Sequence, residues 1–457
     1  MKMKMPNERE ARAPAVIEKV FKSRRLDNVY QLLVNEEDAR VCTDIDDDAC
    51  QVVAGNFLLQ ITTQFFTKLG DSIANPKTVL AWLLSALSAP AVFTAFLVPV
   101  RESGSLIPQL FIASYVRRQP VRKWIFVAGS VLQAVAVICM VLVALALNGT
   151  AAGIGLLSAL VLFSLARGLC SVSSKDVLGK TVPKTRRGRV SGWSEFLAGF
   201  ITIGVGVSLL LDTNDSGAGK TYLVLLSVAA ALWLLAAVSY GMIREFPGAT
   251  GGGGNAITEA FRRMGLLGSD RHFRRFILAR SLLLCSALTA PFIIMLAHQN
   301  TSGTFLVLGL FVIADGAASL VSAPFWGHFA DISSRRVMIV AGAAAAGVGI
   351  VLVALINALP GLAGTNWLYP AFFFMLSIAH AGVRLGRKTY IVDMAGGNRR
   401  TDYVAVSNTV IGVVLLLTGS VGALVPLVGV SGVILILAAM GLAGAWMSAR
   451  LPETEMG

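Results

Sequence analysis

The chain is short of charged residues. Asp, Glu, Lys and Arg together make up 14% of its 457 residues, whereas a typical soluble domain carries about 25%. Hydrophobic residues make up 55% of the sequence, and only 15 residues are proline. This composition excludes a disordered chain, a coiled coil and an ordinary soluble enzyme. Together with a mean hydropathy of +0.71, it indicates a membrane protein with many spanning segments.

Cysteine and histidine are also rare. The five cysteines are odd in number, and their spacing matches no disulfide framework or zinc site. The four histidines lie in separate segments, so no nucleophile–base or metal-binding cluster can be read from the sequence. We therefore expect no metal, no cofactor and no enzymatic activity. The cysteines are Cys42, Cys50, Cys139, Cys170 and Cys285, and the histidines are His272, His298, His328 and His380.

Apolar runs long enough to cross a bilayer recur along the chain. A spanning helix needs about 20 mainly apolar residues, and twelve segments of that kind can be read. The first begins only near Ala54, so no signal peptide is expected. The predicted spans are residues 54–80, 88–116, 122–147, 152–177, 189–211, 221–243, 276–298, 303–327, 337–358, 367–391, 403–428 and 431–449.

The basic residues are distributed unevenly between the connections. Alternate connections are rich in Lys and Arg, while the other set holds only Lys220. By the positive-inside rule, the basic connections and both termini are cytoplasmic. The net charge of +13 therefore reports membrane topology, and no nucleic-acid partner is expected. We expect a monomer in the inner (plasma) membrane of a bacterium.

The chain is predicted to contain two homologous halves. Charged residues of the first six spans match residues of the last six at a constant offset, which a chance coincidence would not maintain along four helices. Parallel six-helix halves with a site between them at mid-membrane are a transporter plan. The matched pairs are Arg122 and Arg335, Glu102 and Asp315, Arg167 and His380, Lys175 and Lys388, Arg186 and Arg399, and Glu195 and Asn408.

This repeat divides the chain into five parts. Residues 51–245 and 276–450 are the two halves, and residues 246–275 are a cytoplasmic linker. Residues 1–50 and 451–457 are cytoplasmic tails. The N-terminal tail contains a helical face of apolar and basic residues, which either lies at the lipid headgroups or packs on the cytoplasmic loops.

Charges within the spans predict which helices face lipid. The third, sixth, ninth and twelfth spans carry none in their interiors, while six of the others do. Intramembrane charge is costly and is expected to face protein or water. The sequence therefore predicts an all-α membrane protein with twelve transmembrane helices in two pseudo-symmetric halves around a central cavity.

The loop after the eighth span carries the most specific motif. It contains Gly327 and Asp331, followed by the paired Arg335 and Arg336. This pattern resembles the loop signature of the major facilitator superfamily, and the resemblance covers residues 51–450. It implies the twelve-helix fold, secondary transport, and a gating role for these four residues in switching between inward- and outward-facing states. The corresponding loop after the second span lacks both the Gly and the Asp.

Four carboxylates are predicted to carry proton coupling, which needs a group that gains and loses a proton as its access changes. Glu102 and its repeat partner Asp315 lie in the middle of their spans, and Asp71 and Glu195 are the other two. The alternative is that these groups form static ion pairs between helices. Lys68 and Asp71, three residues apart, form one such pair in this alternative. Glu195 is alternatively a gate that pairs with an Arg of a loop.

A second set of polar residues is predicted to line the cavity. Polar residues recur at helical spacing along one face of the first span. An Arg at mid-membrane suits an anionic substrate, although equal numbers of basic and acidic residues within the spans favour internal pairing. His380 either titrates near neutral pH or is hydrogen-bonded in a helix core. The predicted cavity residues are Gln60, Gln64, Lys68, Arg101, Arg167, His380, Arg384 and Asn408.

The expected function follows from these features. Residues 215–221 resemble the end of a phosphate-binding loop, but Asn214 replaces the required Gly and no strand precedes it, so no nucleotide partner is expected. We expect a secondary active transporter in the lipid bilayer, moving a small organic solute by alternating access with proton coupling. Two other classes stay open. A membrane enzyme or lipid-handling protein requires a catalytic cluster, and a receptor that kept the transporter fold binds without flux.

Overall fold

The computed structural model describes residues 51–183, 186–211, 218–248, 250, 264–301, 305–394 and 399–453. The predicted N-terminal tail and the glycine-rich part of the predicted linker lie outside these residues. Within them, all regular structure is helical.

The helices before the predicted linker correspond to the first six spans. They are α4 (Val53–Ile73), α5 (Val79–Ala86), α6 (Ala91–Leu106), α7 (Gln109–Arg117), α8 (Lys123–Ala146), α9 (Gly149–Thr181), α10 (Arg187–Leu211) and α11 (Ala218–Gly241).

The helices after it correspond to the last six spans. They are α13 (Leu266–Ser269), α14 (Arg271–Leu282), α15 (Cys285–Asn300), α16 (Phe305–Ile332), α17 (Ser334–Ala358), α18 (Pro360–Ala363), α19 (Leu368–Met394), α20 (Arg399–Gly419), the 3-10 helix η3 (Ser420–Leu424) and α21 (Val425–Ala449).

The first span is a broken helix. The chain leaves the helical path between α4 and α5, at the Asn75–Pro76 pair that predicts a break there. The Lys77 backbone N–H donates to Asn75 Oδ1 at 2.9 Å, which is the local turn that Asn side chains stabilise. The break therefore places Asn75 and Lys77 at an irregular stretch of chain near the middle of the molecule.

Other spans are also interrupted. The second divides into α6 and α7 at Ile107 and Pro108, and the seventh divides into α14 and α15. Within the described ranges, eight helical segments are long and apolar enough to cross a membrane. One of them, Val406–Ala449, covers the last two predicted spans. Gly429, which has a φ of 71°, turns the chain between these two spans. The predicted spans outside these eight are α4–α5, α6–α7 and α16.

Apolar side chains such as Leu142, Val238, Val351 and Trp446 are exposed on the outside of α8, α11, α17 and α21, which are the third, sixth, ninth and twelfth spans. Such exposure is expected for helices that face lipid. The helices α9, α10, α16 and α20 expose apolar side chains as well, so exposure does not single out every third span.

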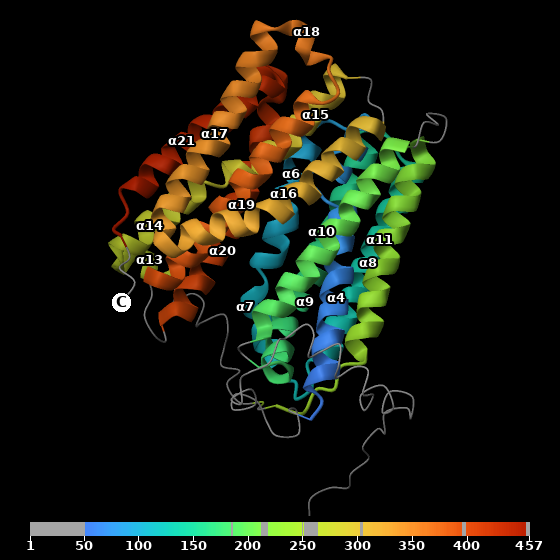
Figure 1. Cartoon of the computed structure of the whole chain (residues 1–457), viewed down its shortest axis with the longest axis vertical. Helices are drawn as coiled ribbons and strands as arrows, with labels where there is room; N and C mark the ends of the chain where they lie inside the picture. Colours follow the sequence, from blue (N-terminus) through green and yellow to red (C-terminus); the bar gives the residue numbers. More distant parts are fainter. Residues whose placement is uncertain are drawn as a thin grey trace, which may run out of the picture.

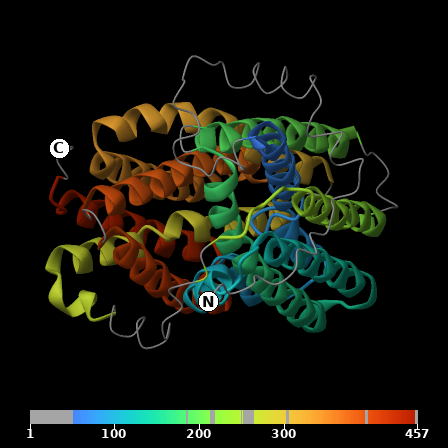
Figure 2. The same ribbon diagram turned by 90° about the horizontal axis from the view of Figure 1, so that it is seen from below.

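The two sets of six spans lie side by side. Figures 1 and 2 place the helices of the first set (blue to green) on one side and those of the second set (orange to red) on the other. They meet mainly where α10 packs on α16, α6 on α20, and α5 on α15. These contacts concentrate at the end of the molecule that is remote from the basic connections.

Glycines allow the closest of these contacts. A Cβ atom on Gly309 of α16 would lie 2.8 Å from the carbonyl oxygen of Gly206 of α10, and one on Gly206 would lie 2.5 Å from Ile313. Two turns along, Gly199 and Gly316 continue the contact. The two backbones therefore approach as closely as small residues permit in membrane helices.

Candidate functional site

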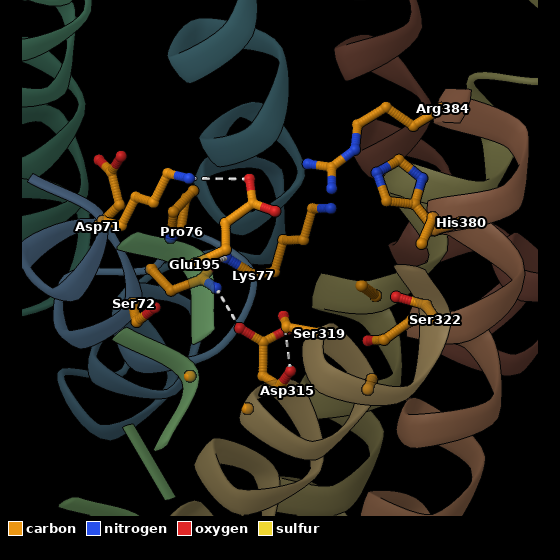
Figure 3. A pocket seen from close by; sticks show the side chains of 18 of the residues that line it. Asp71, Ser72, Pro76, Lys77, Glu195, Asp315, Ser319, Ser322, His380 and Arg384 are labelled. Atoms are coloured by element: carbon orange, nitrogen blue, oxygen red, sulfur yellow. Dashed lines mark hydrogen bonds and ion pairs between the residues drawn. The ribbon is translucent and has the colours of Figure 1, made fainter. Parts of the chain in front are cut away.

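A charged cavity of about 760 Å³ lies between the two halves. Its walls come from α4, α6, α9 and α10 on one side and from α15, α16 and α19 on the other. Figure 3 shows several of its side chains converging on one space. The basic lining residues are Lys68, Lys77, Arg101, Arg167, Arg384 and Lys388, and the acidic ones are Asp71, Glu102, Glu195 and Asp315.

Asp71 holds two arginines in the first half. Its Oδ1 accepts a hydrogen bond from Arg101 at 2.8 Å, and its Oδ2 lies 2.6 Å from a guanidinium nitrogen of Arg167. The Arg101 guanidinium also lies over the ring of Phe163, 4.8 Å from its centroid. These contacts join α4, α6 and α9, so Asp71 has the geometry of a structural ion pair.

Lys68 contacts Glu195, and does not pair with Asp71. Lys68 Nζ lies 2.8 Å from Glu195 and donates to the backbone carbonyl of Ser191 at 3.2 Å. Both contacts are with α10, which lies against α4. Glu195 therefore binds a lysine of the cavity wall, and is exposed on its other side.

Asp315 makes a polar contact between the two halves. Asn75 Nδ2, at the break between α4 and α5, donates to Asp315 Oδ2 at 2.9 Å. Figure 3 shows this bond beneath the Lys77 side chain, with Ser319 one turn further along α16. The described residues provide no cation within ion-pair distance of this carboxylate.

Glu102 is next to Arg101 in the sequence, but the two side chains lie in different environments. Arg101 turns toward Asp71, while Glu102 is exposed in the cavity. Among the described residues no basic group lies within 4.0 Å of its carboxylate. Of the four predicted coupling carboxylates, Glu102 and Asp315 are thus the two that form no ion pair with another described residue.

A stripe of basic and polar residues runs along α19. His380, Arg384 and Lys388 follow one another at intervals of four residues and all line the cavity. The His380 Nδ1 atom and Ser286 Oγ of α15 lie 3.0 Å apart and share a hydrogen bond. Arg384 and Lys388 are exposed to the cavity.

Three predicted cavity residues lie outside the lining. Gln60 is buried and donates to Thr181 at 3.5 Å, Gln64 accepts from Ser194 at 3.3 Å, and Asn408 accepts from Arg280 at 3.1 Å. These side chains bridge neighbouring helices of the same half. Helical spacing identifies the polar face of a span, but not whether that face meets a helix or the cavity.

The predicted gating loop meets the end of the chain. Arg335 donates to Glu453 at 2.7 Å and to the backbone carbonyl of Leu451 at 3.0 Å, and Arg336 lies 3.9 Å from the same carboxylate. Ser333, the N-cap of α17, also donates to Glu453 at 2.8 Å. Gly327 and Asp331 lie in α16, but their side chains are outside what the structure describes.

The first half has a carboxylate in a position that corresponds to that of Glu453 in the second half. Glu245, just beyond α11, accepts from the backbone N–H groups of Arg122 and Lys123 at 2.9 and 2.7 Å, at the start of α8. It also lies 3.1 Å from Lys180. Glu245 and Glu453 thus hold the starts of the third and ninth spans in the two halves. Their repeated position after the sixth and twelfth spans is the sequence signal that could have identified them.

Lys77 is the site residue that the sequence reading missed. It follows Pro76 near the end of a predicted span, where a lysine commonly marks the membrane surface. The break in the first span instead brings it into the cavity. Among the described residues, no three His, Cys, Asp or Glu side chains are grouped so that they could hold a metal ion.

Comparisons with known proteins identify the fold. No protein-family model matches the chain, and no curated protein matches its sequence. A D-xylose-proton symporter is similar in structure over 88% of this chain and 98% of that one, with a TM-score of 0.65 and 13% identity. A POT family transporter in complex with 5-aminolevulinic acid covers 85% and 94%, with a TM-score of 0.67 and 10% identity. The xylose transporter XylE from E. coli, in an inward open conformation, covers 89% and 97%, with a TM-score of 0.62 and 11% identity.

Similarity at such low identity is evidence for the fold, and it agrees with the helices described above. It confirms the predicted class, an all-α membrane protein of twelve transmembrane helices in two six-helix halves around a central cavity. The chain therefore has the fold of the major facilitator superfamily transporters.

Proposed function

We propose that the protein is a secondary active transporter that moves a small organic solute across the membrane by alternating access, coupled to protons. The observation that carries this proposal is the charged cavity of about 760 Å³ between the halves. Pockets of about 300–1,000 Å³ suit small organic ligands. A cavity with walls from both halves changes sides when the halves rock against each other.

The halves proposed to move are residues 51–245 and 276–450, joined by residues 246–275. Their internal contacts support rigid bodies, since the ion pairs of Asp71 and Lys68 each join helices of one half. The hydrogen bonds from Asn75 to Asp315 and from Ser103 to the Gly412 carbonyl cross between them.

Proton coupling is assigned to Asp315 and Glu102. Asp71 and Glu195 already neutralise basic groups by direct contact, so they are better suited to holding helices. The bond from Asn75 to Asp315 is charge-assisted while the carboxylate is ionised, and such bonds are roughly twice as strong as neutral ones. Protonation of Asp315 therefore weakens a contact between the halves, which couples the proton to the conformational change.

We further propose that the structure is the cytoplasm-facing state, in the inner membrane of a bacterium. The basic connections are placed in the cytoplasm by the positive-inside rule. The glycine contact of α10 with α16 then closes the outer end. Opening of this contact and closure of the cytoplasmic ends of the helices produce the opposite state.

Spin-label distances test alternating access without knowledge of the substrate. In a variant with all five cysteines replaced, one pair of labels at Thr150 and Gly361 reports the outer end, and another at Arg118 and Arg336 reports the cytoplasmic end. All four positions are exposed. In nanodiscs, we expect lowering the pH from 8 to 5.5 to lengthen the outer distances and shorten the cytoplasmic ones. One distance at each end of the molecule, the same at both pH values, would contradict the proposal and favour a receptor.

A flux measurement tests transport itself. Proteoliposomes with an imposed pH gradient are offered labelled sugars, nucleosides, dipeptides and organic acids. We expect one class to accumulate above protein-free liposomes and to lose its accumulation when a protonophore dissipates the gradient. Accumulation that a protonophore leaves unchanged would keep transport but overturn proton coupling.

A further inference from the structure

The cavity wall has more basic than acidic side chains. In the first half, Arg101, Arg167 and Lys68 each contact a carboxylate directly. The wall from the second half contains Arg384 and Lys388 and a single carboxylate, Asp315. The lining as a whole has two more basic side chains than acidic ones.

Lys77 and Arg384 form the centre of the unbalanced region. Figure 3 shows the Lys77 side chain extending from the break in the first span toward the Arg384 guanidinium, with His380 beside it. Lys77 lies within the electrostatic reach of Arg384 and Arg387 on one side and of Glu102 and Asp315 on the other. Among the described residues, none of these carboxylates forms an ion pair with Lys77 or Arg384.

Two converging cations repel each other unless an anion lies between them. The energy of this repulsion varies inversely with the separation of the charges and with the local dielectric constant. The repulsion grows as closure of the cavity removes water and lowers the dielectric constant. Asp315 acts on the two cations only at longer range, since its Oδ2 accepts the hydrogen bond from Asn75 and it forms no ion pair with either of them among the described residues. A negatively charged group of a solute that lies between Lys77 and Arg384 would relieve this repulsion.

The surroundings of this position suit an organic group. The cavity lining also contains the apolar side chains of Trp326, Leu376 and Leu385. Such a wall accepts an apolar body, while the guanidinium provides paired donors that match a carboxylate.

We propose that Lys77 and Arg384 bind the carboxylate of an organic anion, and that this anion is the transported solute. The inference rests on the proposed function, because it names the substrate class of the same cavity. Arg384 pairs with the carboxylate through its planar donors, and Lys77 contributes a point charge from the opposite wall. The solute thus contacts both halves, which links its binding to their movement.

The charge preference of the cavity can be measured with thiol reagents of opposite charge. In the cysteine-free background, Ser377→Cys places one thiol on the cavity-lining face of α19. Its reaction rates with sulfonatoethyl methanethiosulfonate (anionic) and trimethylammonioethyl methanethiosulfonate (cationic) are each divided by the rate with free cysteine. We expect the normalised rate to be higher for the anionic reagent. Arg384→Gln or Lys77→Met should each lower the anion-to-cation ratio several-fold, because loss of one positive charge slows the anionic reagent and speeds the cationic one.

Lys175→Gln is the matched control. It removes the same charge from an exposed residue of α9 that is near Lys388 but is not part of the cavity lining. We expect it to leave the ratio within about twofold, because charges exposed to solvent are screened. A ratio of one or less, or an equal fall in the control variant, would overturn the proposal.

Protection by small solutes then tests binding. Benzoate and benzyl alcohol are compared at constant ionic strength, and phenyl phosphate is added to distinguish a carboxylate from a phosphate site. We expect benzoate to slow the anionic reagent several-fold, and Arg384→Gln to abolish this protection. Equal protection by benzyl alcohol would show an apolar pocket instead, and protection by phenyl phosphate alone would overturn the carboxylate assignment. The spin-label distances can change with pH even if the cavity shows no preference for the anionic reagent. That combination of results would leave alternating access intact and overturn only the inference of an anionic solute.

Discussion

Asn75 and Asp315 are bonded across the interface between the two halves, with 2.9 Å between the amide nitrogen and the carboxylate oxygen. The donor lies where the first span is broken, and the acceptor lies within the continuous helix α16. An irregular stretch of one half is therefore attached to a rigid element of the other. A change in the charge of Asp315 acts directly on this attachment.

Asp315→Asn is expected to uncouple transport from protons. The amide keeps the size of the side chain but cannot bind or release a proton at neutral pH. In proteoliposomes, accumulation driven by a pH gradient should fall to the level of protein-free liposomes, because the amide carries no proton through the cycle, while exchange of solute at equal pH should persist. Ser319→Ala, which changes a cavity side chain one turn away, is the control and should retain accumulation. Undiminished pH-driven accumulation in Asp315→Asn would remove this residue from the coupling mechanism.

Asp71→Asn is expected to destabilise the first half. It leaves Arg101 and Arg167 facing each other without the carboxylate that now contacts both. Removing one partner of a buried ion pair costs about 3–5 kcal/mol, and the partial exposure of these side chains reduces the expected loss to about 2 kcal/mol. Thermal unfolding in detergent should show a lower midpoint than wild type. Ser72→Ala, at the adjacent cavity position, should leave the midpoint unchanged, and an unchanged Asp71→Asn midpoint would show that the ion pairs do not stabilise the protein.

Gly206→Ala is expected to open the outer end of the molecule. The added Cβ would lie 2.5 Å from Ile313 and 3.0 Å from the Gly309 carbonyl oxygen, whereas a Cβ on Gly204 meets nothing within 4 Å. Both substitutions favour the helical backbone by about 1 kcal/mol, so Gly204→Ala is a matched control. The spin-label distance between positions 150 and 361 should lengthen only in Gly206→Ala. Equal distances in the two variants would show that the glycine contact does not hold the outer end closed.

Asp270 is expected to make stability depend on pH below about 4. It caps α14, accepting backbone N–H bonds from His272 and Phe273 at 2.8 and 3.0 Å, and its other oxygen accepts from Tyr403 at 2.5 Å. Partial burial raises the pKa of this carboxyl. The hydrogen bonds lower the pKa by more than burial raises it, so the pKa lies below its usual range. Its charge therefore stabilises the protein above the ordinary Asp pKa of about 3.9, and this contribution is lost as the pH falls toward the lowered value.

The corresponding measurement is the thermal midpoint between pH 3 and pH 6. Asp270→Asn keeps a side-chain oxygen for the helix cap but removes the titrating charge. We expect the variant to lose less stability than wild type over this range. The same pH slope in both proteins would show that Asp270 does not contribute to it.

The fold could be predicted because its signals are local. Each span is a long apolar run, and the alternation of basic connections orders the spans across the membrane. The break at Asn75–Pro76 is also local, since proline cannot continue the hydrogen bonding of a helix. What the sequence could not provide is the partner of each polar face. Gln60 fits the same periodicity as the cavity residue Lys68, and Asn408 is the repeat partner of Glu195, but both meet neighbouring helices.

Lys77 shows the reverse case, a cavity residue that the sequence does not identify. Its position after a proline resembles a membrane-surface lysine, and only the path of the broken span brings it to Arg384. Lys68 likewise has an acidic residue three positions away, yet it contacts Glu195 on another helix. Pairing between spans depends on their packing angles, which depend on contacts far apart in sequence, such as Gly206 with Gly309.

The excess of basic residues in the cavity predicts that the proposed transport cycle depends on membrane voltage. Moving one elementary charge across the whole membrane potential is worth about 2.3 kcal/mol per 100 mV. In a cell with a negative interior, the unloaded cavity is drawn toward the cytoplasmic side, and an anionic solute offsets part of that force. In the proposed cycle, the empty and the loaded protein therefore differ in how strongly voltage biases their orientation, and the return of the empty protein is the step on which we expect the potential to act most.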